Sequence, residues 1–227
     1  MEAIILAGGF GTRLSHIVSD VPKPMAPVNN KPFLEYIFNN LSKYNLSKII
    51  MAVGYKSNLI KEHFGDSFKE IKIEYSEELT PLGTGGAIKK AVSICRDKEI
   101  FIINGDTFFD VDLRNMKEIH RDSSCDITIA VKEMKHFNRY GTVIIENNRI
   151  TKFIEKQDVD RGKINGGVYL INRNIFENLD DKVFSFEQTI LESLKYTMCA
   201  YESNGYFIDI GIPEDYYKAQ EDFKYER

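Results

Sequence analysis

Three short, nearly uninterrupted apolar runs restrict the fold of this chain more than any other feature of its sequence. They are Glu2 to Ala7, Lys48 to Val53 and Glu99 to Ile103. Runs of this kind are typical of β-strands that are covered on both faces, and such strands occur mainly in parallel sheets flanked by helices. The runs therefore predict a mainly parallel sheet at the centre of an α/β fold.

Amphipathic stretches between and after these runs predict the helices. Apolar residues recur at helical spacing over Pro32 to Leu41, Asn58 to Phe64, Gly85 to Ile94 and Leu113 to His120. Pro32 suits a first helical turn, where its missing N–H costs nothing. Strands and helices are thus expected to alternate through about the first 120 residues.

The pattern changes after Ser124. Short strands are expected over residues 127–131, 141–145, 150–154 and 168–171, joined by hairpins with polar turns such as Asn147-Asn148. Two helices, at about Phe186 to Leu194 and Pro213 to Phe223, are expected to cover the remaining surface. We find no internal repeat and no linker-like segment, so we expect residues 1–227 to form a single domain with a division near residue 123.

Charge and hydropathy exclude several classes of protein. The 30 Lys and Arg residues against 34 Asp and Glu residues give a net charge of −4, so no overall positive field favours nucleic acid. The first apolar run, Ala3 to Ala7, ends at Gly8-Gly9 and is too short for a signal peptide core or a membrane span. We expect a cytoplasmic protein that binds neither nucleic acid nor membrane.

Cysteine and histidine spacing gives no sign of a soft-metal site. The three cysteines, at positions 95, 125 and 199, form no Cys-x-x-Cys pair, and the four histidines form no ligand pair. We expect the cysteines to be reduced and mostly buried. A zinc site is not expected.

A glycine-rich loop from Leu6 to Leu14 directly follows the first predicted strand. Its glycines allow backbone N–H groups to approach phosphate oxygens closely. Leu14 stands where a dinucleotide fingerprint needs its last glycine, and no Gly-Lys-Ser/Thr sequence follows, so neither that fingerprint nor a P-loop is present. Lys23 lies between two prolines in a loop that is expected to be extended. Both Arg13 and Lys23 could bind phosphate, or they could be solvated cations at a surface turn.

Several motifs in a fixed order resemble the sugar-1-phosphate nucleotidyltransferases. They cover most of the chain and comprise residues 6–14, 22–28 with 31–32, 81–87, 104–106, 153–156, 165–169 and 208–216. The resemblance implies a single Rossmann-like domain with a mixed, mostly parallel sheet flanked by helices. It also implies that about residues 1–123 bind the nucleotide and that about residues 124–227 form a smaller, β-rich part that binds the sugar.

The resemblance further implies a reaction between two polyanions. A sugar 1-phosphate oxygen attacks the α-phosphorus of a nucleoside triphosphate, and pyrophosphate leaves. Arg13 is implied to bind the triphosphate, Lys23 the α-phosphate and Lys156 the incoming sugar phosphate. The opening forty residues and the segment from Leu82 to Ile88 point, within the family, to GTP and a manno-configured heptose 1-phosphate.

Two carboxylates are implied to share a Mg²⁺ ion. Asp106 follows a buried strand at its carboxyl end, where open α/β sheets hold their ligands, whereas Asp209 lies far along the chain. Carboxylate oxygens suit Mg²⁺. Without the resemblance, each residue reads more simply as a turn or loop aspartate than as a metal ligand, because Asn-Gly-Asp and Asp-x-Gly are common turn sequences.

The remaining site residues are assigned by the family pattern. Guanine carries N–H donors whose hydrogen bonds a carboxylate can accept, so Glu77 and Glu78 are candidates for recognising the base, with Glu78 preferred. Alternatively, both residues are solvated surface acids, or the backbone near Leu6 recognises the base. The nucleotide is expected to contact Leu6, Ala7, Gly8, Gly9, Gly11, Thr12, Glu78, Gly83, Thr84 and Gly85. The sugar phosphate is expected to contact Tyr140, Gly141, Glu155, Lys156, Asn165 and Gly166.

Two of these sugar-side assignments have an open alternative. Gln157 stands where many relatives continue Glu-Lys with proline, which weakens the expected geometry of Lys156. Tyr140 reads equally well as a packing aromatic.

Alternative functions remain open from the sequence alone. The same reaction could use UTP, CTP or dTTP, or another sugar phosphate such as mannose 1-phosphate. A non-catalytic sensor is disfavoured because Arg13, Lys23 and both aspartates are present. Asp110-Val111-Asp112 fits the metal motif of glycosyltransferases, but Asp112 reads more simply as a helix N-cap. The chain could act as a monomer or a homodimer.

Overall fold

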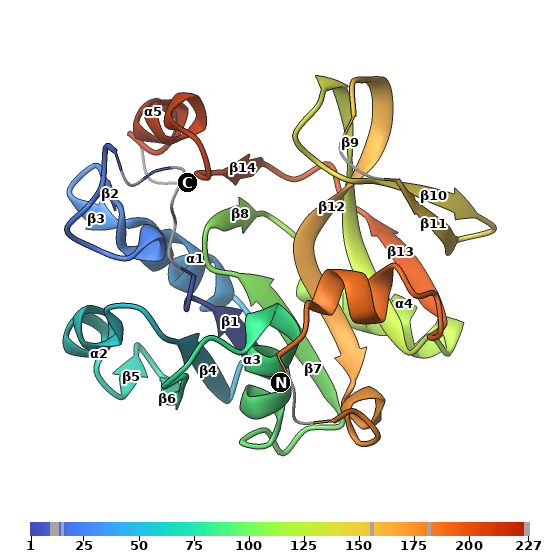
Figure 1. The fold of residues 1–227 in the computed structure, drawn as a ribbon, viewed down its shortest axis with the longest axis horizontal. Coiled ribbons are helices and arrows are strands. Elements are labelled where there is room, and N and C mark those ends of the chain that lie inside the picture. The colour runs from blue at the N-terminus through green and yellow to red at the C-terminus, as the bar shows by residue number, and fades with distance from the viewer. Residues whose placement is uncertain (10–13, 15, 155–156, 181–182, 225–227) are drawn as a thin grey trace.

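The computed structural model describes residues 1–9, 14, 16–154, 157–180 and 183–224, and joins their strands mainly into one ten-stranded sheet (Figure 1). Its strands are β1 (Glu2–Leu6), β4 (Lys48–Val53), β5 (Ser67–Phe68), β6 (Ile71–Glu77), β7 (Glu99–Asn104), β9 (Ile127–Phe137), β10 (Thr142–Glu146), β11 (Arg149–Ile154), β12 (Val159–Asn172) and β13 (Met198–Glu202). The spatial order is β10-β11-β13-β9-β12-β7-β1-β4-β6-β5.

Helices and two small sheets surround this large sheet. The α-helices are α1 (Phe33–Leu41), α2 (Ser57–Phe64), α3 (Gly83–Val92), α4 (Leu113–Ser123) and α5 (Pro213–Asp222). The short helical turns are η1 (Lys23–Met25), η2 (Arg173–Phe176) and η3 (Glu187–Leu191). The small sheets pair β2 (Pro27–Val28) with β3 (Lys31–Pro32), and β8 (Thr107–Phe109) with β14 (Phe207–Asp209).

The predicted parallel core is confirmed. β1 pairs in parallel with both β4 and β7, and β4 pairs in parallel with β6. Ala3 and Ile5 face one apolar layer, with α1 and α5, whereas Ile4 faces the opposite layer, with α3 and η3. Both faces of β1 are therefore covered, which explains why its sequence is apolar at nearly every position.

The hairpin pairing expected after Ser124 is present, and it makes the large sheet less parallel than the resemblance implied. β12 runs antiparallel to both β7 and β9, and β10 and β11 form an antiparallel hairpin, while only β9 and β13 pair in parallel there. The hairpin turn was predicted correctly: Asn147 and Asn148 both have positive φ, which asparagine tolerates better than most residues. Tight turns favour antiparallel neighbours, so the sheet is mixed as a whole.

Some predicted elements differ in extent or type. Helix α3 begins two residues earlier than expected, and the helix expected over Phe186 to Leu194 is the single π-helical turn η3. β9 continues beyond the predicted Val131 as a partly exposed, charged ribbon paired with β12. Because that extension lacks an apolar run, hydropathy alone gave no sign of it.

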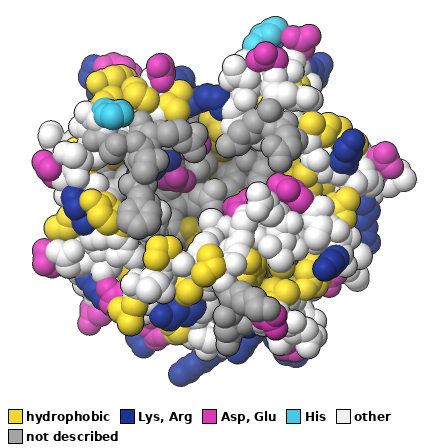
Figure 2. Space-filling model, in the orientation of Figure 1, with side chains coloured by type: hydrophobic (Ala, Val, Ile, Leu, Met, Phe, Trp, Pro, Cys, Tyr) yellow, Lys and Arg dark blue, Asp and Glu magenta, His cyan; other side chains and the backbone are white. Residues whose placement is uncertain are grey.

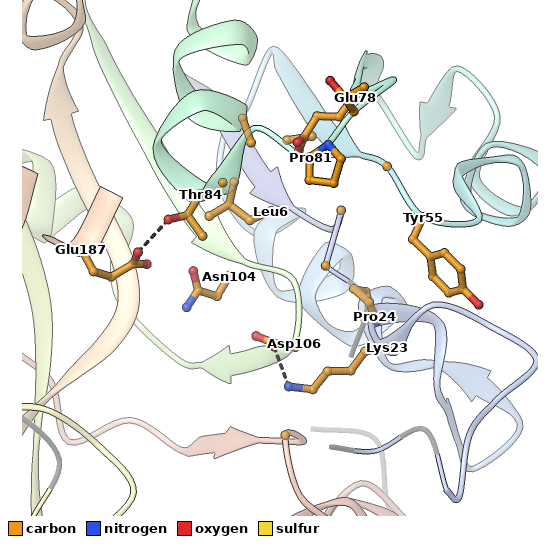
Figure 3. A pocket seen from close by; sticks show the side chains of 18 of the residues that line it. Leu6, Lys23, Pro24, Tyr55, Glu78, Pro81, Thr84, Asn104, Asp106 and Glu187 are labelled. Carbon is orange, nitrogen blue, oxygen red and sulfur yellow. Dashed lines mark hydrogen bonds and ion pairs between the residues drawn. The ribbon is translucent and has the colours of Figure 1, made fainter. Parts of the chain in front are cut away.

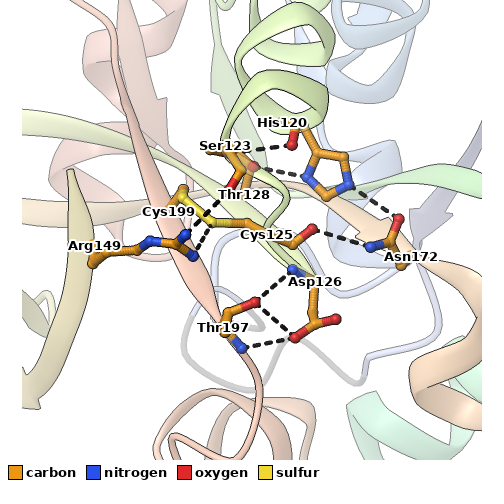
Figure 4. Close-up of a disulfide and its surroundings, with 9 residues drawn as sticks. All are labelled: His120, Ser123, Cys125, Asp126, Thr128, Arg149, Asn172, Thr197 and Cys199. Carbon is orange, nitrogen blue, oxygen red and sulfur yellow. Dashed lines mark hydrogen bonds between the residues drawn. A yellow bond between two sulfur atoms is a disulfide. The ribbon is translucent and has the colours of Figure 1, made fainter.

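The expectation of three reduced cysteines is wrong for two of them. Cys125 and Cys199 form a disulfide with a Cα–Cα distance of 6.1 Å, while Cys95 is buried and free (Figure 4). Parallel pairing of β13 with β9 places Cys199 beside Thr128, and thereby near Cys125. The 74-residue separation concealed this contact from sequence spacing.

The surface shown in Figure 2 mixes acidic and basic side chains and is notched at its upper edge, between the α5 side and the β9–β12 ribbon. In the described part of the chain, no helix has both the length and the apolar character that crossing a bilayer requires.

Candidate active site

A cavity of about 650 Å³ opens at the carboxyl ends of the parallel strands (Figure 3). This position agrees with the rule that open α/β sheets bind ligands at that edge. Eight of the residues predicted for the site line it, namely Leu6, Gly8, Gly9, Lys23, Glu78, Gly83, Thr84 and Asp106.

Lys23 lies between the two carboxylates that were predicted to act together. Its Nζ is 2.6 Å from Oδ2 of Asp106 and 3.5 Å from Oδ1 of Asp209, and its side chain is only 11% exposed. One ammonium group thus contacts two carboxylates that come from distant parts of the chain. The three groups are close enough to act on one shared ligand.

Backbone pairing brings these groups together. β14 pairs with β8 so that Asp209 lies opposite Thr107, and the N–H of Ile210 donates to the carbonyl of Asp106. Lys23 begins the 3₁₀ turn η1 instead of lying in the expected extended loop, whereas Pro22, just before it, has the extended conformation. The turn forms because the N–H groups of Met25 and Ala26 bond back to Pro22 and Lys23.

Gly211 makes the approach of Lys23 to Asp209 possible. The N–H of Gly211 donates to Oδ1 of Asp209 at 2.7 Å. A Cβ atom on Gly211 would lie 2.8 Å from that oxygen and 3.0 Å from Nζ of Lys23. Any larger residue would therefore push the ion pair apart.

Asp209 has the electrostatics of a ligand for a cation. Burial raises the pKa of its carboxyl group, and the negative charge of Asp106 raises the pKa further, while Lys23 and the Gly211 N–H act in the opposite direction. Two neighbouring carboxylates fit a hard divalent cation, which prefers oxygen ligands. In the described part of the chain no cluster of three or more His, Cys, Asp or Glu side chains could hold a metal, so substrate oxygens and water would complete the coordination.

The structure separates the two glutamates that were candidates for reading the base. Glu77 accepts bonds from Ser57 and Lys61 on α2 and does not line the cavity. Glu78 lines the cavity, and its Oε2 accepts a bond of 2.8 Å from the N–H of Leu82. Glu78 is therefore the one held toward a ligand.

The glycines at the start of α3 leave space for Phe184, a residue of the second half of the chain. A Cβ atom on Gly85 would lie 2.1 Å from the ring of Phe184, and one on Gly83, whose φ is +71°, would lie 2.5 Å from its carbonyl oxygen. The N–H of Gly85 donates to that carbonyl. Gly85 is buried and does not line the cavity, so its small size serves this packing.

Tyr140 and Gly141 lie on the connection between β9 and β10. Burial raises the pKa of the Tyr140 hydroxyl, and the charges of Asp209 and Asp106 also raise it. The Tyr140 ring packs edge-on against Phe207, two residues before Asp209. Tyr140 is thus near the carboxylate pair although it does not line the cavity.

Asn165 and Gly166 form part of an irregularity in β12. Asn165 donates to the hydroxyl of Tyr169 and accepts from the N–H of Gly167, and the register between β12 and β9 shifts over this segment. Gly166 is packed against Phe109, whose ring a Cβ atom would meet at 2.4 Å. These two residues therefore shape the strand beneath the site.

Comparison with known proteins assigns this arrangement to a family. A family model described as nucleotidyl transferase matches residues 2–226. The chain belongs to this nucleotidyl transferase family.

Individual relatives cover almost the whole chain. It is 52% identical over 229 residues to a D-glycero-alpha-D-manno-heptose 1-phosphate guanylyltransferase of Aneurinibacillus thermoaerophilus, covering 99% of each protein. It is 49% identical to the protein of that name from Campylobacter jejuni, covering 96% of this chain and 97% of the relative. The crystal structure of HddC from Yersinia pseudotuberculosis complexed with GMP-PN superposes with a TM-score of 0.89 at 38% identity, covering 98% of this chain and 99% of that one.

Several predicted residues lie elsewhere. Ala7 is buried, and its N–H donates to the carbonyl of Ala52 within the sheet, so it supports the cavity from below. Five predicted residues, Gly11, Thr12, Arg13, Glu155 and Lys156, fall outside the described residues. Asp112 caps α4 by accepting from the N–H groups of Arg114 and Asn115, which confirms the N-cap reading of the Asp-x-Asp string.

Several residues that line the cavity or lie near it were not among the predicted site residues. Asn104 and Glu187 line the cavity. Arg139 pairs with Asp215 at the start of α5, and the negative charge of Asp209 contributes to raising the pKa of its guanidinium group. Asn104 directly follows the strand predicted over Glu99 to Ile103 and belongs to the motif at residues 104–106, which is a signal that could have identified it. Glu187 and Arg139 carry no such signal, because both reach the site through contacts between distant segments.

Proposed function

We propose that this chain transfers a guanylyl group from GTP to D-glycero-α-D-manno-heptose 1-phosphate, producing GDP-heptose and pyrophosphate. The observation that carries the proposal is the placement of Lys23 between Asp106 and Asp209 at the edge of a glycine-lined cavity. The two heptose 1-phosphate guanylyltransferases that match along nearly their full length support the choice of substrates.

The chemistry requires that two anions be held together. An oxygen of the sugar phosphate bonds to the α-phosphorus as the bond from that phosphorus to the β-phosphate bridging oxygen breaks, and pyrophosphate leaves with the electron pair. Charge on the α-phosphate oxygens must be stabilised as this happens. Lys23 is buried enough to act through a low dielectric, and its two carboxylate partners hold its ammonium group at a fixed position.

Asp106 and Asp209 would hold a Mg²⁺ ion in this scheme. When bound, that ion supplies positive charge to the phosphate oxygens. The carboxylates are suited to it because both contact the Lys23 ammonium group and because their mutual repulsion favours a shared cation.

Glu78 is proposed to read guanine. A carboxylate accepts two hydrogen bonds at once, which matches the N1–H and amino donors of guanine and not the carbonyl-bearing edge of uracil or thymine. The N–H of Leu82 bonds to Oε2 of Glu78, and the other carboxylate oxygen, Oε1, faces Gly8. Oε1 lies 3.1 Å from the position that a Cβ atom on Gly8 would take. Backbone groups of Leu6, Gly8 and Gly9 would lie beside the same nucleotide.

The sugar phosphate is proposed to lie toward Tyr140, Gly141, Asn165 and Gly166, with Glu155 and Lys156 as further contacts and Arg13 on the triphosphate. The structure supports this direction through the position of Tyr140 near Asp209. Residues 1–227 are proposed to act as one catalytic domain, because a single sheet runs from β5 to β10 through both halves.

Pyrophosphate release with each of GTP, UTP, CTP and dTTP tests the nucleotide. The acceptors are the heptose 1-phosphate, mannose 1-phosphate and glucose 1-phosphate. We expect release with GTP and the heptose 1-phosphate to exceed every other combination. Preference for mannose 1-phosphate would retain the guanylyl transfer and reject the heptose, whereas preference for UTP, CTP or dTTP would reject the role of Glu78. No release with any combination would reject catalysis.

A further inference from the structure

The segment from Phe184 to Glu187 connects the second half of the chain to the nucleotide-side cavity. The carbonyl of Phe184 accepts from Gly85, its N–H donates to the carbonyl of Leu82, and the N–H of Phe186 donates to Oγ1 of Thr84. These bonds form a short ladder along the start of α3. The segment is therefore seated firmly on one wall of the cavity.

Glu187 is oriented by two hydroxyl groups. Thr84 and Ser185 both donate to its Oε2, at 2.7 and 2.8 Å. The neighbouring Phe186 is fully buried and packs edge-on against Tyr169, with 5.2 Å between ring centroids. The carboxylate is thus held on a rigid anchor and is not a freely rotating surface acid.

The second carboxylate oxygen is available to a ligand. Oε1 of Glu187 has no hydrogen-bond partner among the residues that the structure describes, and the side chain lines the cavity on a different wall from Glu78 (Figure 3). The hydroxyl of Thr84 donates its one hydrogen to Glu187 and accepts from Phe186, so it has no donor left for a ligand and no charge to attract one. Glu187, and not Thr84, is therefore the polar group that this wall offers.

The charge of Glu187 restricts what it can bind. A carboxylate repels phosphate oxygens, and Glu78 and Asp106 add further acidic side chains to the same cavity. Neutral hydroxyl groups, in contrast, donate well to a carboxylate oxygen. We propose that Glu187 binds the hydroxyl groups of a substrate sugar ring, either the ribose of the nucleotide or the ring of the acceptor sugar.

This proposal rests on the proposed function, because only a reaction between a nucleotide and a sugar phosphate brings hydroxyl-bearing rings into the cavity. It assigns a specificity role to a residue of the second half that faces a pocket built mainly by the first. The Phe184–Phe186 ladder is the positioning device that makes the assignment possible.

The test measures binding and kinetics separately. Calorimetry gives the Kd of GTP and of 2′,3′-dideoxy-GTP for wild type, Glu187→Ala and Glu187→Gln. Steady-state assays give the KM for the heptose 1-phosphate at saturating GTP. Glu192→Ala is the matched control, since Glu192 is an exposed acid at the end of the same turn and does not line the cavity.

If Glu187 binds the ribose, Glu187→Ala weakens GTP about tenfold, as expected for a hydrogen bond to a charged group, and leaves dideoxy-GTP unchanged. If Glu187 binds the acceptor, the KM for the heptose 1-phosphate rises by a similar factor and the Kd of GTP does not change. Either result supports the proposal. Glu187→Gln keeps the shape of the side chain and is expected to show a smaller effect in the same direction.

Two results overturn the proposal. One is no change in any of the three measurements. The other is an equal loss of GTP and dideoxy-GTP binding with an unchanged acceptor KM, which would indicate a structural role. If a variant fails to fold, wild type alone still tests it: equal Kd values for GTP and dideoxy-GTP, together with an unaltered KM for a deoxygenated sugar 1-phosphate, exclude a hydroxyl contact. Absence of guanylyl transfer by wild type would instead reject the proposed function.

Discussion

The two halves of the molecule contribute to the cavity by different means. In residues 1–123, three of the site side chains lie at or just after the carboxyl ends of parallel strands: Leu6 ends β1, Glu78 follows β6 and Asp106 follows β7. In residues 124–224 the site residues, such as Asp209 and Glu187, are held by contacts to the first half. Local sequence therefore encodes the first set, and packing between distant segments positions the second.

Lys23→Ala should cause the largest loss, because it removes the cation that links both halves. We expect turnover to fall roughly 10³-fold, in the range that loss of one transition-state donor produces. Pyrophosphate release measures the rate, and thermal unfolding checks that the variant folds. Lys72→Ala, which removes an exposed lysine paired with Glu74, is the control. Near-normal turnover of Lys23→Ala would reject its role.

The variants Asp106→Asn and Asp209→Asn test whether each half of the chain supplies a ligand to the metal. Chelation of the metal should abolish activity, and added Mg²⁺ should restore it. Each variant should need at least about tenfold more Mg²⁺ than wild type, because loss of even an outer ligand has an effect of this size on metal sites. Titration of activity with Mg²⁺ measures this. A change in Asp106→Asn alone would show that the second half supplies no metal ligand.

The same titration has an expected pH dependence. Because burial and Asp106 raise the pKa of Asp209, this carboxyl group retains its proton to a higher pH than an ordinary aspartate. The metal binds the ionised form, so Mg²⁺ affinity of wild type should decrease on acidification before that of an exposed carboxylate site would. A Mg²⁺ affinity that is flat over the acidic range would contradict the coupling.

Gly85→Ala tests the contact between the halves at α3. The added methyl group would collide with the Phe184 ring, at a cost of about 1–3 kcal/mol in the free energy of unfolding. Phe184→Ala should relieve most of that cost in the double variant. Urea unfolding of the four proteins measures the coupling. Additive losses would show that the halves do not depend on this contact.

Glu78→Gln and Glu77→Gln make a matched pair within the first half. Glu78→Gln should raise the KM for GTP about tenfold, equivalent to about 1.4 kcal/mol, because one face of guanine loses a charged acceptor. Glu77→Gln should leave that KM unchanged, since Glu77 faces α2. Equal effects of the two variants would mean that the residues do not differ in role.

His120 gives the smallest expected effect and lies at the seam of the halves. It bonds to Thr128 and Asn172, and burial lowers the pKa of its imidazole. Folding therefore disfavours the protonated imidazole of His120. The stability that this residue contributes is fully present above the ordinary histidine pKa, and it is lost as the pH falls from there toward the pKa of the imidazole in the folded protein. Urea unfolding at several pH values should show a shallower decrease for His120→Gln than for wild type.

The sequence predicted the first half well because its signals are local. The continuous apolar runs predicted β1, β4 and β7, and the position of Asp106 just after β7 agreed with the metal-binding role that the family resemblance implies. Periodicity likewise indicated α1 and α4, and the Asp112 cap at the start of α4. Each of these features depends on residues that are near one another in the chain.

Tertiary structure alone decided which distant segments meet. It pairs Asp209 with the β8 edge, joins Cys125 to Cys199, selects Glu78 over Glu77 and brings Glu187 to the cavity wall. Such contacts depend on the register between strands and on the space that glycines such as Gly85 and Gly211 leave open. Neither hydropathy nor spacing records which segments come within van der Waals distance, so a site built between the two halves becomes visible only once the chain is folded.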